Sequence, residues 1–461
     1  MRSAECPAEE RQACSGRESP AERSRANEAV GPENDGGLEA EKDRIREKFA
    51  MSAGDACDSE LRGEIEREAL NSRILRERMT ISGIASFVSS VFAEMRGLGI
   101  LDPLLDDPEI TEIMVNGPDS VFVEKGGRTE KTDLRFESEK KLEDIIQRVV
   151  GRAGREVNRA NPIVDTRLPD GSRVNVVLPP VSLSGASMTI RRFPSGQMTV
   201  GRLIELGSLT SDAAGFLELL VRARYNLFIS GGTGSGKTTF LGALTGFIPP
   251  DERIITIEDS AELRLSGIEN LVSLEVRNAN SAGAGRVTVS DLIKSSLRMR
   301  PERIIVGEVR GAEALDMLQA MNTGHDGSIS TGHANSTRDM LGRLETMVIQ
   351  GGSGLPSEAV RRQIASAIDI VVHLSRMRDR SRRTVEISEV TDFCPESGEI
   401  GIRKIFEFVE DGADGGKEND SVKGSLRRTG AGLKNCGKLK LAGLYGKYVS
   451  VFGEEGSDED R

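Results

Sequence analysis

The chain has 461 residues, enough for about three domains of typical size. Its 62 basic and 73 acidic side chains give a net charge of −11, and it has no Trp, so composition argues against a general nucleic-acid binder. No apolar run approaches the roughly 18 residues of a membrane span. The N-terminus lacks an apolar signal core and the five Cys form no CxxC pair, which together indicate a reduced, cytosolic protein.

The N-terminal part of the chain changes character near Leu61. Residues 1–60 carry little apolar surface, and we expect a disordered acidic tail because such a stretch cannot offset its ordering entropy. From Leu61 to residue 99, apolar side chains recur every three to five positions, which predicts a small helical bundle.

Residues 100–193 show the mixed periodicity of an α+β domain. Short strands are expected at 113–115 and 121–123, and a helix with apolar residues at i, i+3, i+4, i+7 and i+8 begins near Leu142. The turn at 169–171 has the sequence Pro-Asp-Gly and joins two further strands. We interpret the following residues, 194–205, as a linker.

The segment 206–410 alternates apolar strands with helices. Buried strands are expected at 227–229, 254–257, 304–306 and 368–372. This alternation predicts an α/β fold with a doubly wound, mostly parallel sheet. Residues 411–461 are rich in Gly and charge, and we expect a solvated C-terminal tail there.

A phosphate-binding loop follows the first of these strands. Residues 231–238 fit G-x-x-x-x-G-K-[ST], between a strand and a helix, where glycines let backbone N–H groups turn toward phosphate oxygens. Lys237 is expected to reach the β and γ phosphates, and the Thr238 hydroxyl to bind Mg²⁺. The expected nucleotide-binding residues are Gly231, Gly232, Thr233, Gly234, Ser235, Gly236, Lys237, Thr238 and Thr239.

Two carboxylates and two histidines follow downstream. Glu258 and Glu308 end predicted strands, and ligands of open α/β sheets bind beyond such ends. Glu308 is the candidate base for the attacking water, with Glu258 orienting the water or the metal's water shell. His325 and His333 lie among glycines, and they are either structural or serve as a γ-phosphate sensor or subunit contact. Their spacing matches no zinc motif.

Four segments, in order and spacing, resemble the secretion ATPases of type II and type IV secretion and of type IV pili. The match looks closest to the CpaF-like branch, which powers tight-adherence (Tad/Flp) pili, and covers about residues 85–395. Two departures are Gly332 before the second histidine and the lack of an aspartate before Gly307. The four segments are GGTGSGKTT (231–239), TIEDSAEL (256–263), LRMRPERIIVGEVRG (297–311) and TGHDGSISTGHANS (323–336).

The resemblance implies a RecA-like P-loop NTPase domain preceded by an α+β, PAS-like domain and a helical segment. It also implies a homohexameric motor that uses ATP and Mg²⁺ and contacts inner-membrane platform proteins at the inner face of the cytoplasmic membrane. From the net charge of −11 and the absence of Trp, we expect no direct contact with nucleic acid. Relatives place arginines of the first domain on the phosphates. Two alternatives stay open: a DNA-translocating motor on the same core, and a nucleotide-dependent regulatory switch. The arginines in the matching segments are Arg167, Arg173, Arg191 and Arg192.

Overall fold

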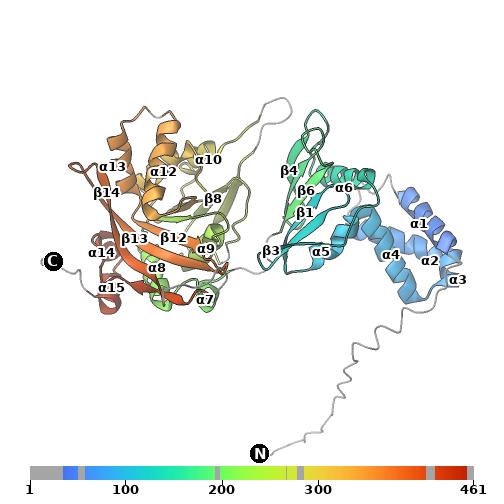
Figure 1. Ribbon diagram of the computed structural model, residues 1–461, viewed down its shortest axis with the longest axis horizontal. Coiled ribbons are helices and arrows are strands. Elements are labelled where there is room, and N and C mark those ends of the chain that lie inside the picture. Colours follow the sequence, from blue (N-terminus) through green and yellow to red (C-terminus); the bar gives the residue numbers. More distant parts are fainter. Residues whose placement is uncertain are drawn as a thin grey trace, which may run out of the picture. The chain divides into compact units, whose positions relative to one another are not determined.

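The computed structural model describes most of the chain and divides it into two compact units. The first unit is Met1–Arg192 and the second is Phe193–Arg461. We describe each unit by itself (Figure 1). The described residues are 35–49, 58–192, 198–265, 267–277, 285–352, 354–411 and 421–453. None of the helices in these ranges is both long and apolar enough to cross a lipid bilayer.

The first unit begins with four helices that share one apolar core. Ile45, Leu61 and Ile65 are fully buried in it, and Val91 joins them from the fourth helix. The expected disordered tail at 1–60 is therefore wrong for residues 35–49 and 58–60, which are helical; residues 1–34 and 50–57 lie outside the described part. The helices are α1 (Asp35–Phe49), α2 (Asp58–Asn71), α3 (Arg73–Arg78) and α4 (Ile81–Arg96).

The first helix was missed because its apolar residues are few but well placed. Ile45 reaches the shared core, and Glu68 of α2 accepts ion pairs from both Arg44 (2.9 Å) and Lys48 (2.6 Å) of α1. The average composition of this segment does not predict a helix, because most helical stability comes from tertiary packing rather than from intrinsic propensity.

The rest of the first unit is a six-stranded antiparallel sheet with one long helix. The strand order is β3-β2-β1-β6-β5-β4. The helix α6 begins at the Ser138 N-cap and buries the apolar stripe predicted from Leu142 onward. The elements are η2 (Gly99–Leu101), α5 (Asp102–Asp106), β1 (Ile110–Asn116), β2 (Val121–Lys125), β3 (Arg128–Lys131), α6 (Glu139–Arg152), β4 (Ile163–Arg167), β5 (Arg173–Val177) and β6 (Ser187–Arg191).

The second unit is built on a nine-stranded sheet, in the order β15-β14-β13-β12-β7-β11-β10-β8-β9. The strands from β12 to β9 pair in parallel, and β13, β14 and β15 extend the sheet antiparallel. The α/β, mostly parallel prediction is confirmed. The strands are β7 (Leu227–Gly231), β8 (Ile254–Glu258), β9 (Leu271–Glu275), β10 (Arg303–Val306), β11 (Ile329–Gly332), β12 (Ile370–Arg376), β13 (Arg382–Cys394), β14 (Glu399–Glu410) and β15 (Gly424–Arg428).

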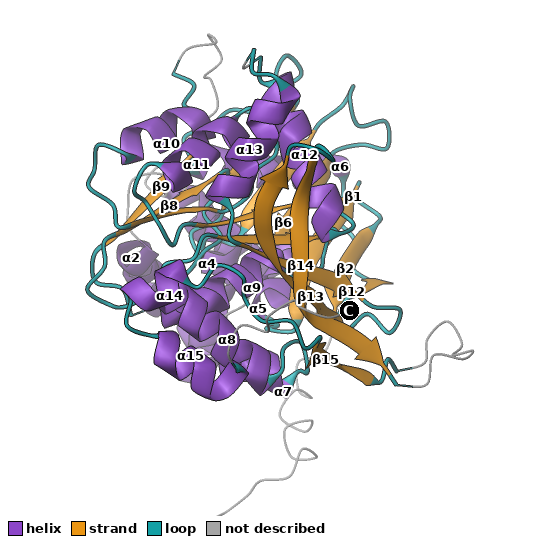
Figure 2. Cartoon of the chain, turned by 90° about the vertical axis from the view of Figure 1, so that its left-hand side faces the viewer, coloured by secondary structure: helices purple, strands orange, loops and turns teal. Residues whose placement is uncertain are grey.

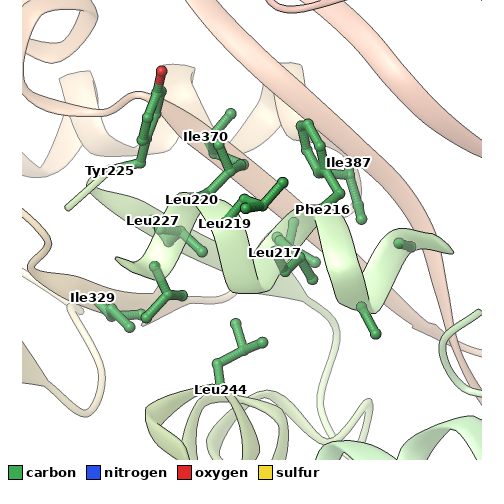
Figure 3. Close-up of a cluster of buried hydrophobic side chains, with 14 of the residues drawn as sticks. Phe216, Leu217, Leu219, Leu220, Tyr225, Leu227, Leu244, Ile329, Ile370 and Ile387 are labelled. Carbon is green, nitrogen blue, oxygen red and sulfur yellow. The ribbon is translucent and has the colours of Figure 1, made fainter. Parts of the chain in front are cut away.

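Helices cover both faces of this sheet and give it two apolar cores (Figure 2). One core packs Phe216, Leu217 and Leu220 of α8 against the strands (Figure 3). The other packs α10 to α13 on the opposite face. The helices are α7 (Val200–Glu205), α8 (Ser211–Arg222), α9 (Lys237–Leu244), η3 (Thr245–Phe247), α10 (Val289–Ser296), α11 (Glu313–Asn322), α12 (Thr337–Gln350), α13 (Ser357–Ala367), α14 (Gly437–Leu441) and α15 (Tyr445–Phe452).

Two further expectations need correction in the second unit. The expected linker at 194–205 contains α7, which buries Leu203 in the first core. The expected tail at 411–461 contains β15, α14 and α15, and buries Leu439 and Tyr448 in the same core. The Tyr448 hydroxyl accepts a hydrogen bond from Leu433 N (2.9 Å). A few large apolar residues among many glycines and charges are enough to anchor these segments.

Candidate functional site

The phosphate loop joins β7 to α9 with the backbone that its glycines allow. Gly234 and Gly236 have φ of +71° and +92°, a region that side chains disfavour. A Cβ on Gly231 would stand 2.6 Å from Ser235 Oγ and would also collide with the carbonyl oxygen of Leu374. The loop therefore keeps its shape only with glycine at these positions, and α9 presents its N-terminus to the cradle.

Lys237 is held in the loop by three acceptors. Its Nζ lies 3.1 Å from Gly231 O, 3.0 Å from Gly232 O and 3.2 Å from His333 Nδ1. An ammonium has three donors, so all of them are used. Burial lowers the pKa of Lys237, and the nearby carboxylate of Glu308 opposes that shift. A bound phosphate would replace these neutral acceptors with charged ones.

His333 links the lysine to Glu308. A lysine ammonium can only donate, so His333 Nδ1 must accept, and the ring proton is placed on Nε2. That Nε2 lies 2.9 Å from Glu308 Oε1. Burial lowers the pKa of His333, and the charge of Lys237 lowers it further, which favours the neutral ring that this arrangement requires.

These three side chains meet because their strands are parallel neighbours. Strand β7 pairs with β11, and β11 pairs with β10, so Lys237, His333 and Glu308 follow strand ends at one edge of the sheet. Gly332 also fits this packing: a Cβ there would stand 3.0 Å from both Met340 and Phe228. The departure from the family pattern is thus accommodated by these two larger neighbours.

Arg310 is a member of the cluster that sequence reasoning did not single out. Its Nη2 donates to Glu308 Oε2 (2.7 Å), and its Nη1 lies 3.4 Å from Asp259 Oδ2. The hydrogen bond to Glu308 raises the pKa of Arg310. The available signal was a basic residue two positions after the catalytic candidate. Arg310 also lines a polar cavity of about 430 Å³ with Asn335 and Arg343.

Glu258 lies beside this cluster, but its carboxylate is engaged by its own loop. Oε1 accepts hydrogen bonds from Glu262 N (3.0 Å) and Leu263 N (3.1 Å). The side chain is buried, and its stem fills the space beside Gly307. Glu258 therefore shapes the turn that carries Asp259, whereas Glu308 stands next to Lys237 and His333.

His325 lies away from this cluster. It precedes β11, whereas His333 follows β11, so the two histidines flank opposite ends of one strand. His325 Nδ1 lies 3.3 Å from Ala320 O of α11. Within the second unit His325 thus lies at the other end of the strands from the phosphate loop, and its expected role as a γ-phosphate sensor or a subunit contact stays a prediction.

The third histidine, His373, lies directly beside the phosphate-loop strand. It is on β12 opposite Ser230, and its Nδ1 lies 3.2 Å from Ser230 Oγ. Burial lowers the pKa of His373. No sequence motif predicts this contact, because only the pairing of β12 with β7 creates it.

Of the four candidate arginines in the first unit, three form a row. Arg167 pairs in register with Arg173, and Arg173 with Arg191, so their side chains share one face of the sheet. Arg191 Nε lies 3.6 Å from Glu112 Oε1. Arg192 instead donates to the backbone oxygens of residues 107 and 110, the latter at 3.1 Å. Arg192 thus ties its own unit together.

The residues present fit a magnesium-bound nucleoside triphosphate. The glycine-shaped cradle and Lys237 suit the phosphates, and Thr238 follows Lys237 at the start of α9, where a hydroxyl can bind Mg²⁺. When bound, the metal would neutralise phosphate charge. Glu308 remains the candidate base: its Oε2 accepts from Arg310, and its buried Oε1, 2.9 Å from His333 Nε2, has no hydrogen-bond partner among the described residues.

Comparison with known proteins identifies the family of this chain. Residues 94–427 match the family described as type II/IV secretion system protein. A Mycobacterium tuberculosis protein named for conjugal transfer is 40% identical over 301 residues, covering 64% of this chain and 85% of that protein. The type IV secretion system protein PtlH of Bordetella pertussis is 35% identical over 318 residues, covering 63% of this chain and 93% of that protein.

Among solved structures, the VirB11 ATPase of the Brucella suis type IV secretion system is 33% identical. The match covers 63% of this chain and 92% of that chain, with a TM-score of 0.36. The family match spans well over half of the chain and includes the phosphate loop, Glu258, Glu308 and both histidines of the His segment. The chain is a member of the type II/IV secretion system protein family.

Proposed function

We propose that this protein is an ATP-hydrolysing motor that powers transport of protein or pilin subunits through a membrane-bound machine. The ATPase activity follows from family membership. The observation that carries the proposal is the connected series of Lys237, His333 and Glu308, because it joins a phosphate ligand to a base through one neutral imidazole. A protein that only bound nucleotide would need no such base.

The motor works as a homohexamer with Mg²⁺ and ATP, docked on platform proteins at the inner face of the cytoplasmic membrane. The family pattern supports this assembly, and the Tad/Flp pilus is the machine that the sequence resembles most. His325 then serves at a contact between subunits. The arginine row of the first unit, Arg167, Arg173 and Arg191, supplies the positive charge that stabilises phosphoryl transfer.

The experiment is a steady-state ATPase assay on the purified protein, with and without its platform proteins and Mg²⁺. Hydrolysis that depends on Mg²⁺ and is stimulated by the platform supports the proposal. Nucleotide binding without hydrolysis under every condition would instead identify a regulatory switch.

A motor that moves DNA is the second candidate, because some relatives are named for conjugal transfer. The net charge of −11 opposes direct DNA binding. Stimulation of hydrolysis by double- or single-stranded DNA would favour this candidate over protein transport.

A further inference from the structure

A strongly basic hairpin stands next to the phosphate loop. Strands β12 and β13 are joined by the turn at 377–381, and residues 376–383 contain five arginines. Strand β12 pairs in parallel with β7, with Leu374 opposite Gly231. The hairpin therefore continues beyond the edge of the sheet at which the phosphate loop begins.

Three charged side chains of this hairpin make their contacts away from the phosphate loop. The Arg378 guanidinium pairs with Glu410 on β14. Arg383 donates to the Gly207 carbonyl and to Ser381 Oγ. The Asp379 carboxylate, the one acid of the turn, accepts from Ser381 N (2.9 Å) and from Val422 N (2.8 Å).

Arg376 and Arg382 face the phosphate loop. Arg382 Nε donates to Gly234 O (3.0 Å), and a Cβ on Gly236 would stand 3.2 Å from Arg382 Cδ. A Cβ on Gly234 would stand 3.6 Å from Arg376 Nη1. Within the described ranges, no carboxylate lies within ion-pair distance of Arg382.

Arg376 and Arg382 bring two positive charges together beside the phosphate loop. They are direct partners in the β12–β13 register, and like charges directly opposite each other destabilise a sheet. A guanidinium has five N–H donors, and in Arg382 the bond to Gly234 uses the one on Nε. The remaining donors suit phosphate oxygens, to which arginine binds as a planar fork.

We propose that Arg376 and Arg382 form a second cationic contact to the bound nucleotide, on phosphate oxygens that ADP and ATP share. The proposal rests on the proposed function, because it requires the loop to bind a nucleotide. Lys237 approaches the phosphates from inside the loop, whereas these arginines approach from the neighbouring strand pair. The contact is made to substrate and product alike, so it contributes to affinity and leaves the chemical step unchanged.

The test is calorimetric titration of the full chain with MgADP and with a slowly hydrolysed ATP analogue. Arg382→Ala weakens both affinities about tenfold or more, the range of a hydrogen bond to a charged group. Arg376→Ala weakens both in the same direction, and Arg382→Lys retains part of the affinity. Steady-state assays show a raised KM with little change in kcat.

Arg378→Ala is the matched control, because it removes one positive charge from the same turn but acts on Glu410. Its affinities stay within about twofold of wild type, as expected for an exposed ion pair. An Arg382→Ala variant that matches this control, or that loses affinity for the ATP analogue alone, would overturn the proposal. Wild-type protein that binds neither nucleotide would overturn the proposed function itself.

Discussion

Replacing Glu308 by glutamine tests the centre of the site. Oε2 of Glu308 accepts from Arg310 (2.7 Å), whereas Oε1 lies 2.9 Å from His333 Nε2 and has no hydrogen-bond partner among the described residues. Glutamine keeps one acceptor and gains an NH₂ group. If the glutamine oxygen keeps the hydrogen bond from Arg310, the amide NH₂ group takes the place of Oε1 and faces the Nε2 proton of His333. His333 must then move, or change to the tautomer that sets an N–H against Lys237.

Glu308→Gln should lower the rate of the chemical step more than the affinity for ATP. A general base contributes about 10²–10⁴ in rate, so Glu308→Gln should lower kcat at least about 100-fold. That is about 2.7 kcal/mol of barrier at 1.36 kcal/mol per decade. ATP binding should persist, because the phosphate loop is intact. A shift in the Lys237 contact to His333 should lower affinity by about ten- to a hundredfold at most, the range of one hydrogen bond to a charged group.

Two measurements separate the effect on rate from the effect on binding. Phosphate release under single-turnover conditions measures the chemical step, and titration with the ATP analogue measures binding. In the double variant with His333→Ala, the clash with the imidazole is gone. If that clash perturbs binding in Glu308→Gln, the double variant should recover the lost affinity but not the lost rate.

Glu258→Gln is the comparison that can refute this assignment. The Glu258 carboxylate accepts from Glu262 N and Leu263 N, so its replacement should disturb the loop more than the chemistry. A 100-fold loss of kcat in Glu258→Gln, beside a nearly normal Glu308→Gln, would reverse the two roles.

Four further predictions concern binding, charge, pH and stability. Lys237→Ala should abolish ATP turnover, because it removes the positive charge that the lysine places on the β and γ phosphates. Arg173→Ala or Arg191→Ala should cut hydrolysis sharply, up to about 10³-fold, without changing the oligomer. Because the pKa of His333 is lowered, activity should stay level near neutral pH and fall only below about 6.5, as the ring gains a proton that faces Lys237. Tyr448→Ala should destabilise the second unit by about 3–5 kcal/mol in chemical denaturation.

Each of these has a contrary result. Near-normal turnover in Lys237→Ala would mean that this loop is not the catalytic one. Normal hydrolysis in both arginine variants would remove the first unit from the chemistry. A rate that falls between pH 8 and 7 would contradict a neutral His333. A Tyr448→Ala variant as stable as wild type would mean that α15 is not part of the core.

The residue pattern alone predicts those local features whose chemistry is contained in a short segment. The phosphate loop follows from glycines, a lysine and a threonine at fixed spacing between a strand and a helix, and α6 from the apolar spacing that begins at Leu142. Alternating strands and helices likewise determined the α/β class and the mostly parallel sheet. In each case the signal is complete within a few turns or one strand.

Other features depend on the pairing of distant segments and follow only from the folded structure. Strand order placed His333 beside Lys237 and Glu308, and put His325 at the opposite end of β11. The same order brought Arg382 to the phosphate loop, 148 residues from the Gly234 carbonyl that it contacts. Packing of a few large side chains made helices of segments that composition describes as tails. These outcomes depend on which surfaces pack together, and the residue pattern of one segment does not specify the segment that it packs against.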